Sequence, residues 1–112
     1  MKKICLIFPF FGEWPSYFNF FLKSCENNSS IHFLFFTDSE IPATKAKNIT
    51  FHPFTLQDFN LLASQKLGFH IVVEKSYKLC DFRPAFGIIF EDYIREMDFW
   101  GHSDLDVILG NI

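Results

Sequence analysis

Residues 4–8 read ICLIF, and this unbroken apolar run decides the class of fold. A strand that shows no alternation of apolar and polar side chains is buried on both faces, as the strands of parallel sheets are. Residues 31–36 (IHFLFF) repeat the pattern, and a shorter strand is expected over residues 49–54, with Pro53 near its end. The strands therefore predict a mainly parallel sheet that is covered on both sides.

Helical patterns separate these strands, so the chain is expected to be an α/β layered domain. Pro15 suits the first turn of a first helix, residues 55–58 (TLQD) resemble a capping box for a second, and Gly68 suits its C-cap. Residues 69–74 fit a short strand or a loop, and residues 98–109 are expected to hold a strand, a turn and an apolar stretch. Three apolar stripes with helical spacing define the helices, namely Trp14, Phe18, Phe21, Leu22 and Cys25; Leu56, Phe59, Leu62, Ala63 and Leu67; and Phe86, Ile89, Phe90, Tyr93, Ile94 and Met97.

The composition limits the class of protein. The 112 residues suit one domain, and a 49% hydrophobic content is ample for a buried core. A net charge of -3 without a basic stripe argues against nucleic acid as a partner. Three cysteines without a CxxC pair indicate reduced thiols. No apolar run is long enough for a membrane span. We therefore expect a cytoplasmic protein, and a location at the inner face of the membrane stays open. Residues 107–112 are apolar with nothing to cover them, so we expect a truncated piece of a longer protein.

Asp104 and Asp106 form the sharpest chemical motif, a DxD that follows a hydrophobic segment. Carboxylates at i and i+2 lie on one side of an extended strand, about 6 to 7 Å apart. Oxygen ligands of this kind suit Mg²⁺ or Mn²⁺, and a diphosphate would complete the shell of either ion. His102 shares their parity and is either a further ligand or an ordinary partly buried histidine. A solvated acidic turn is the alternative for the whole motif.

Lys78, Asp81 and Arg83 form a second cluster, which we expect at the start of the third helix. A helix N-terminus favours phosphate, and the two cations strengthen that preference. Asp81 is a candidate both for the N-cap and for a bond to a ribose hydroxyl, and the two roles are compatible.

Two further groups fall where strands are expected to end, which is where parallel sheets bind ligands. Asp38 follows the second strand and suits a bond to a base or ribose, or a simple Asx-turn. Residues 9–12 (PFFG) follow the first strand and would present Pro9 and Phe10 to a base, or only end the strand with a buried loop.

Four segments in order carry a resemblance to a known family: residues 7–12 (IFPFFG), 34–38 (LFFTD), 77–84 (YKLCDFRP) and 99–106 (FWGHSDLD). Together they resemble a group of bacterial glycosyltransferase-like proteins that accompany capsule and surface polysaccharide genes and have the GT-A fold. The resemblance covers nearly the whole chain and is more specific than the DxD alone.

The resemblance implies that residues 1–112 are the Rossmann-like, donor-binding half of a GT-A-type domain. It implies transfer of a sugar from a nucleoside-diphosphate donor, UDP-linked, to a hydroxyl of a glycan or lipid-linked acceptor, with Mn²⁺ or Mg²⁺ at Asp104 and Asp106. Relatives continue past residue 112, so the acceptor site and any catalytic base are expected outside this chain, and its own activity stays open. By the same resemblance the nucleotide-contacting residues are Pro9, Phe10, Asp38, Lys78, Asp81, Arg83 and Asp104.

Three alternatives remain. A truncated or non-catalytic domain would bind a nucleotide, or only a partner. A nucleotidyltransferase also uses a parallel sheet and two carboxylates, but residues 9–12 are not a Gly-rich phosphate loop. A haloacid-dehalogenase-type phosphatase has a hydrophobic strand followed by DxD, but at the start of its domain.

Overall fold

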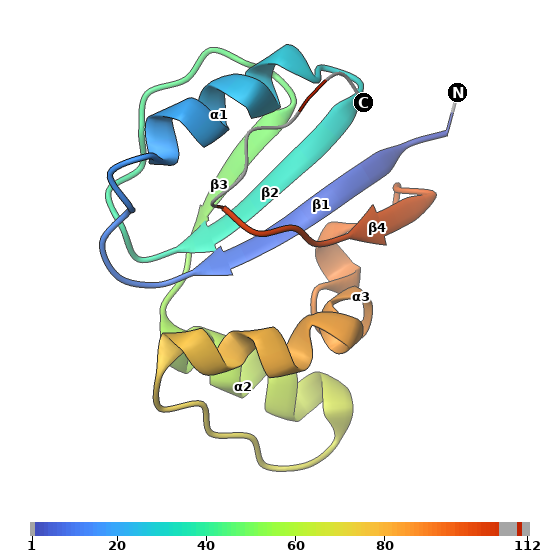
Figure 1. The fold of residues 1–112 in the computed structure, drawn as a ribbon. Helices are drawn as coiled ribbons and strands as arrows, with labels where there is room; N and C mark the ends of the chain where they lie inside the picture. The colour runs from blue at the N-terminus through green and yellow to red at the C-terminus, as the bar shows by residue number, and fades with distance from the viewer. Residues whose placement is uncertain (1, 106–109, 111–112) are drawn as a thin grey trace.

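One parallel sheet of four strands, in the order β3-β2-β1-β4, forms the centre of the molecule. The computed structural model describes residues 2–105 and 110 (Figure 1). Its strands are β1 (Ile4–Phe10), β2 (Ile31–Thr37), β3 (Ile49–Pro53) and β4 (Phe99–Gly101). The predicted parallel α/β fold is confirmed, and its strand order and crossovers give a Rossmann-like topology.

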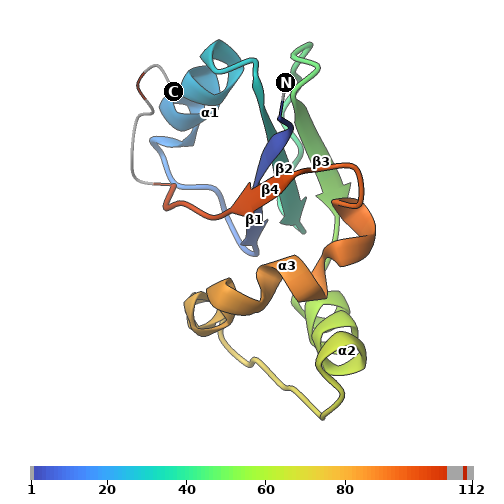
Figure 2. The same ribbon diagram turned by 90° about the vertical axis from the view of Figure 1, so that its right-hand side faces the viewer.

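Helices cover both faces of this sheet, as Figure 2 shows. On one face lies α1 (Phe18–Asn27), and on the other lie α2 (Leu56–Leu67) and α3 (Phe86–Ile89). Two 3₁₀ helices, η1 (Ser76–Ala85) and η2 (Glu91–Tyr93), flank α3. None of the helices in the described residues is long and apolar enough to cross a bilayer.

Side chains that alternate along each central strand build a separate core on each face. In β2, Phe33 and Phe35 pack under α1, whereas Leu34 and Phe36 pack under α2 and α3. Phe35 is fully buried and stacks on Phe8 of β1, with 4.9 Å between the ring centroids. Burial on both faces explains why these strands read as continuous apolar runs.

Local chemistry fixes the ends of α2 as the sequence predicts. The Thr55 hydroxyl accepts from the Asp58 amide at 3.0 Å, and the Asp58 carboxylate accepts from the Thr55 amide at 2.9 Å. Gly68 ends the helix at φ 80, a left-handed conformation that costs glycine little. The first helix differs from the prediction, because α1 begins at Phe18 and Pro15 lies in the preceding turn, where its carbonyl accepts from the Phe18 amide.

The predicted third helix is wrong in length. The apolar stripe from Phe86 onward yields only one α-helical turn, α3, followed by the 3₁₀ turn η2. Ahead of it, Pro84 lies inside η1, where its ring removes an amide donor and disfavours a regular α-helix. Asp81 therefore lies within η1 and does not cap α3, whose N-cap is Ala85.

The strand order reverses between β1 and β4, and this position is a topological switch point of the sheet. The chain passes from β1 to β2 through α1 on one face, and from β3 to β4 through α2, η1 and α3 on the other. The segments that leave the carboxyl ends of β1 and β4 both run on the α1 face, where Trp14 and Leu105 pack against the same core cluster. In open parallel sheets, the crevice at such a point is where ligands bind.

Candidate functional site

β4 stops early and leaves the carboxyl half of β1 open. The pairing joins only three residues on each strand, from Ile4 with Phe99 to Leu6 with Gly101. On its other side β1 pairs with β2 along its whole length, as far as Phe10 with Thr37. Among the described residues, no strand pairs with residues 7–10 on the β4 side.

Alternation along β1 decides which backbone groups line this open edge. The Lys3 carbonyl accepts from the Phe99 amide at 3.1 Å, so Lys3 faces β4. Every second residue faces the same side, and hence Ile7 and Pro9 do too. Proline carries no amide hydrogen, so Pro9 sits in a strand where its missing donor disturbs no pairing. The edge past β4 therefore offers the carbonyls of Ile7 and Pro9 as acceptors.

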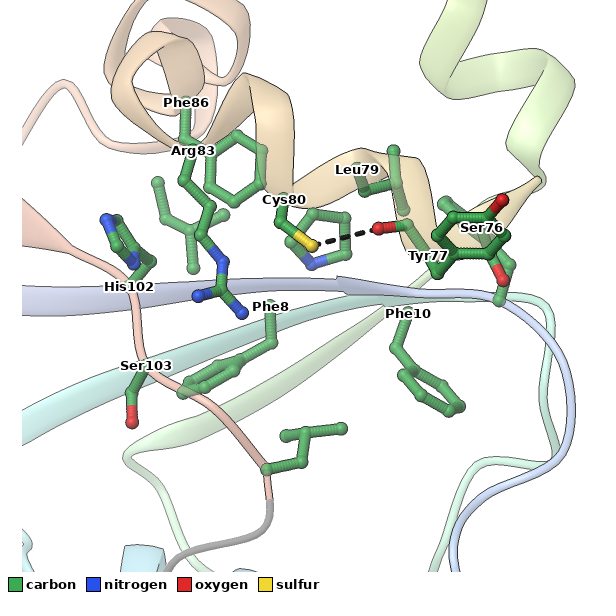
Figure 3. Close-up of a pocket in the computed structure, with 14 residues that line it drawn as sticks. Phe8, Phe10, Ser76, Tyr77, Leu79, Cys80, Arg83, Phe86, His102 and Ser103 are labelled. Carbon is green, nitrogen blue, oxygen red and sulfur yellow. Dashed lines mark hydrogen bonds between the residues drawn. The ribbon is translucent and has the colours of Figure 1, made fainter. Parts of the chain in front are cut away.

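A pocket of about 290 Å³ occupies this edge, between β1, η1 and the segment after β4. This volume lies near the lower end of the range for small-molecule sites. Leu79 and Phe86, both buried, belong to its apolar wall, and His102 meets the Phe86 ring edge-on at 6.4 Å. Figure 3 shows its polar side chains, which come from η1 and from the segment after β4.

Arg83 brings a cation to the pocket and pairs with the first carboxylate of the DxD. Its Nη2 lies 2.7 Å from Asp104 Oδ1. In Figure 3 the Arg83 side chain extends from η1 toward β1, with His102 on one side and Cys80 on the other. The Asp104 side chain is 61% exposed, so the pair adds at most about 1 kcal/mol to folding and is free to exchange for a ligand. The exposure of Asp104 also corrects the expectation of a carboxylate in a hydrophobic setting.

The 3₁₀ geometry of η1 separates the predicted phosphate-binding residues. In such a helix, side chains at i and i+3 lie one above the other. Tyr77, Cys80 and Arg83 therefore form one column, and all three line the first pocket. Lys78 and Asp81 form the neighbouring column and line a second pocket. The sequence predicts Lys78, Asp81 and Arg83 at one site, but the structure brings only Arg83 to the β1–β4 crevice.

The residues at the ends of β1 and β2 also lie in different places. Pro9 and Phe10 line the first pocket. Asp38 does not line it, because its Oδ1 accepts from the Gly12 amide at 2.8 Å and holds the loop after β1 against the end of β2. Gly12 has φ 105, a conformation that favours glycine.

An aromatic column supports this loop from the α1 side. Trp14 stacks on Phe10 at 4.9 Å and on Phe18 at 4.0 Å, and its indole Nε1 donates to the Glu40 carbonyl at 2.7 Å. The column fixes Phe10 at the margin of the pocket.

Tyr77 and Cys80 are pocket residues that sequence reasoning did not single out. The Cys80 thiol donates to the Tyr77 carbonyl at 2.9 Å, and both side chains are exposed. Their spacing from Arg83 is the signal that would have found them, provided that η1 is recognised as a 3₁₀ helix.

The expected metal motif lies partly outside the described residues, because Asp106 is not among them. β4 ends at Gly101, so His102 and Asp104 do not continue a strand, and the expected i, i+2 strand geometry does not apply to Asp104. Within residues 2–105 and 110, no group of three His, Cys, Asp or Glu side chains gathers to hold a metal ion. The donor chemistry of Asp104 fits Mn²⁺ or Mg²⁺, although its Oδ1 already accepts from Arg83.

Comparisons with known proteins give a family and nothing more specific. No curated protein and no solved structure matches the chain. A family model described as a family of unknown function, DUF6625, matches residues 6–112 and so includes all the residues that line the first pocket. The chain therefore belongs to the family of unknown function DUF6625.

Proposed function

We propose that this chain is the donor-binding region of a glycosyltransferase and holds a nucleoside-diphosphate sugar, UDP-linked, in the crevice between β1 and β4. One observation carries the proposal: a pocket at the topological switch point is lined by Arg83, whose guanidinium pairs with Asp104. A parallel sheet binds ligands at this place, and a guanidinium is a strong partner for phosphate.

Each side chain of the crevice has a role in this proposal. Arg83 would exchange Asp104 for a phosphate oxygen and offset charge that builds on the departing diphosphate. Phe10 and Tyr77 offer aromatic surface to the base or the sugar, and the carbonyls of Ile7 and Pro9 would accept from the base. Asp104, with Asp106, would hold Mn²⁺ or Mg²⁺, which supplies further neutralisation of the diphosphate.

A second candidate, nucleotide binding without sugar transfer, is favoured by the same ion pair. Asp104 Oδ1 accepts from Arg83 at 2.7 Å, so a metal ion would compete with the guanidinium for this oxygen. In that case Arg83 would bind the phosphate, and binding would not need a divalent ion.

Calorimetric titration with UDP and with GDP, each with and without Mn²⁺, tests the proposal. Binding that Mn²⁺ strengthens and that Asp106→Ala abolishes supports a metal-dependent donor site. Equal binding without Mn²⁺ would favour the second candidate. A folded sample that binds neither nucleotide under either condition would overturn both.

Two substitutions separate the roles of the ion pair. Arg83→Gln removes the cation and is expected to weaken UDP at least tenfold, about the value of one charge-assisted hydrogen bond. Asp104→Asn should remove the gain from Mn²⁺ and leave metal-free binding at least as tight as in the wild type, because Arg83 no longer has to leave a carboxylate. Arg95→Gln and Glu96→Gln are matched controls, because both residues are exposed and neither lines a described pocket.

A further inference from the structure

A second pocket, of about 490 Å³, lies beside the column of η1 that carries Lys78 and Asp81. Its wall includes Glu74 and Lys75 from the segment after α2, and Phe82 from η1. Tyr77 lines this pocket and the first one, so a single aromatic ring borders both cavities.

Side chains of α2 hold the wall of this pocket in place. Asn60 binds both backbone groups of Val73, donating to its carbonyl at 3.1 Å and accepting from its amide at 2.8 Å. Ser64 does the same for Ile71, accepting from its amide at 2.7 Å and donating to its carbonyl at 3.2 Å. Residues 69–75 contain no regular structure, yet four hydrogen bonds fix their path, so the pocket is formed before any ligand arrives.

The charges on the wall balance. Glu74 and Asp81 are acidic, Lys75 and Lys78 are basic, and all four residues are exposed. The two carboxylates disfavour a phosphate, the two ammonium groups disfavour a metal ion, and four charges disfavour an apolar ligand. Four exposed charges that sum to zero instead suit a neutral ligand with many hydroxyl groups, which can bond to charges of both signs.

Tyr77 adds an aromatic surface to these polar groups. Tyr77 is 64% exposed, and the Lys78 ammonium lies over its ring, 5.5 Å from the centroid, so a stacking sugar would use the other face or displace this ammonium. An aromatic face with flanking polar groups matches a sugar ring, whose C–H faces are apolar and whose rim carries hydroxyls.

We propose that the second pocket binds a neutral saccharide unit, with Tyr77 as the ring on which it stacks. Saccharide binding as such stands independently of the nucleotide site. Its role as an acceptor subsite, adjoining the donor across Tyr77, rests on the proposed glycosyltransferase function.

Amide NMR titration of the isotope-labelled chain with methyl glucoside and methyl galactoside tests the proposal. Saturable shifts are expected at the amides of Val72, Lys78 and Asp81 at millimolar sugar. Tyr77→Leu should weaken binding by about tenfold, which corresponds to about 1.4 kcal/mol. Arg95→Gln serves as the control, because Arg95 is exposed and lines neither pocket, and it should leave sugar affinity unchanged.

Three results would overturn the proposal: no saturable shift at these amides, a Tyr77→Leu variant that binds as wild type, or tighter binding of glucuronate or glucosamine than of the neutral glucoside. Titration of the same sample with UDP keeps the two proposals apart. UDP binding without sugar binding removes the saccharide site alone, and sugar binding without UDP binding removes the nucleotide site alone.

Discussion

Gly87 of α3 lies directly against the indole ring of Trp100 in β4. A Cβ atom built on Gly87 would stand 2.3 Å from both Cε2 and Nε1 of that ring. Only hydrogen fits between them, so this contact sets how closely α3 approaches the strand that borders the pocket.

Gly87→Ala is therefore expected to displace the Trp100 ring, which is 38% exposed and has room to swing outward. Overpacking of this kind costs about 1–3 kcal/mol of unfolding free energy. Urea denaturation measures the loss, and the indole N–H resonance of Trp100 reports the displacement. Gly110→Ala is the control, because a Cβ there meets nothing within 4 Å. A variant with an unshifted indole resonance and wild-type stability would show that the contact is looser than described.

Asn48 fastens the end of α1 to the start of β2. Its buried side-chain amide donates to the carbonyls of Cys25, Asn28 and Ile31, at 3.0, 3.1 and 3.0 Å. We expect Asn48→Ala to lower the unfolding free energy by about 1–3 kcal/mol, because three carbonyls lose this donor. Asn48→Asp should cost more at neutral pH, since a carboxylate would face carbonyl oxygens, and less in acid, where it is protonated.

Denaturant titrations at neutral and acidic pH measure both Asn48 variants. Asn19→Asp is the control, because Asn19 is exposed and lies in α1, the helix whose end Asn48 binds. Equal stability of the Ala and Asp variants at neutral pH would contradict the assigned hydrogen bonds.

His52 should make stability depend on pH. Burial lowers the pKa of His52 from 6.5, and its ring stacks on Phe36 at 4.9 Å. The unfolded chain therefore binds a proton at a higher pH than the folded protein does. Stability is unaffected above pH 6.5, falls as the pH drops through that value toward the lower folded pKa, and levels off below it.

The His52 prediction is checked by comparing denaturation midpoints across that range of pH. His52→Phe should flatten this part of the pH profile, and His70→Gln, at an exposed loop position, should leave it unchanged. A His52→Phe profile that keeps the full slope would assign the effect to other groups.

Cys80 should be the reactive thiol of the chain. It is exposed and lines the first pocket, whereas burial raises the pKa of Cys5 to about 11 and that of Cys25 to about 12. A maleimide at mildly alkaline pH is expected to modify Cys80 alone, since the thiolate is the reactive form. Mass spectrometry of peptides identifies the site, and Cys80→Ser should abolish labelling of the folded protein.

If nucleotide occupies the first pocket, UDP should slow this labelling, and the Cys80 adduct should prevent UDP binding. Unchanged UDP affinity after complete labelling would place the nucleotide elsewhere.

Pro9 is expected to influence the choice of base, a prediction that rests on the proposed function. The open edge of β1 offers carbonyl acceptors at Ile7 and Pro9. A carbonyl that meets the ring N3 position favours uracil, which donates there, over cytosine, whose N3 accepts and which donates only through its amino group. Pro9→Ala adds an amide donor at that edge and should narrow the preference for UDP over CDP by about tenfold, roughly one hydrogen bond. Calorimetry of both nucleotides checks the ratio, and an unchanged ratio would exclude base contact at this edge.

Much of the fold could be read from the chain because its determinants are local. The unbroken apolar runs of β1 and β2 require cover on both faces, and Thr55 and Gly68 fix the ends of α2 through their own side chain and backbone. The third helix was wrong because spacing alone does not show how an apolar stripe is buried. Phe90 is fully buried against Phe36 at the end of a single α-helical turn, and Pro84 keeps the preceding segment 3₁₀.

The candidate site was less predictable for a related reason. Strand ends located Pro9 and Phe10 near the crevice, because parallel strands direct their carboxyl ends to one edge. Arg83 was instead expected with Lys78 and Asp81 at the start of a helix. The separation of Lys78 and Asp81 from Arg83 depends on three residues per turn in η1 rather than 3.6. β4 ends at Gly101, which leaves the pocket open, and nothing in the sequence of the pocket residues predicts this early end.

The seam between β1 and β4 also bears on how the molecule folds. The Lys3 amide donates to Asp98 across 95 positions of sequence, the longest separation among its described side-chain hydrogen bonds. Pairing β4 with β1 closes a loop of this length, which costs conformational entropy, and only three residue pairs form in return. We therefore expect β1, α1 and β2 to assemble first and β4 to dock late. The crevice would then take shape in the final step, and its walls would be the first part of the native state to come apart.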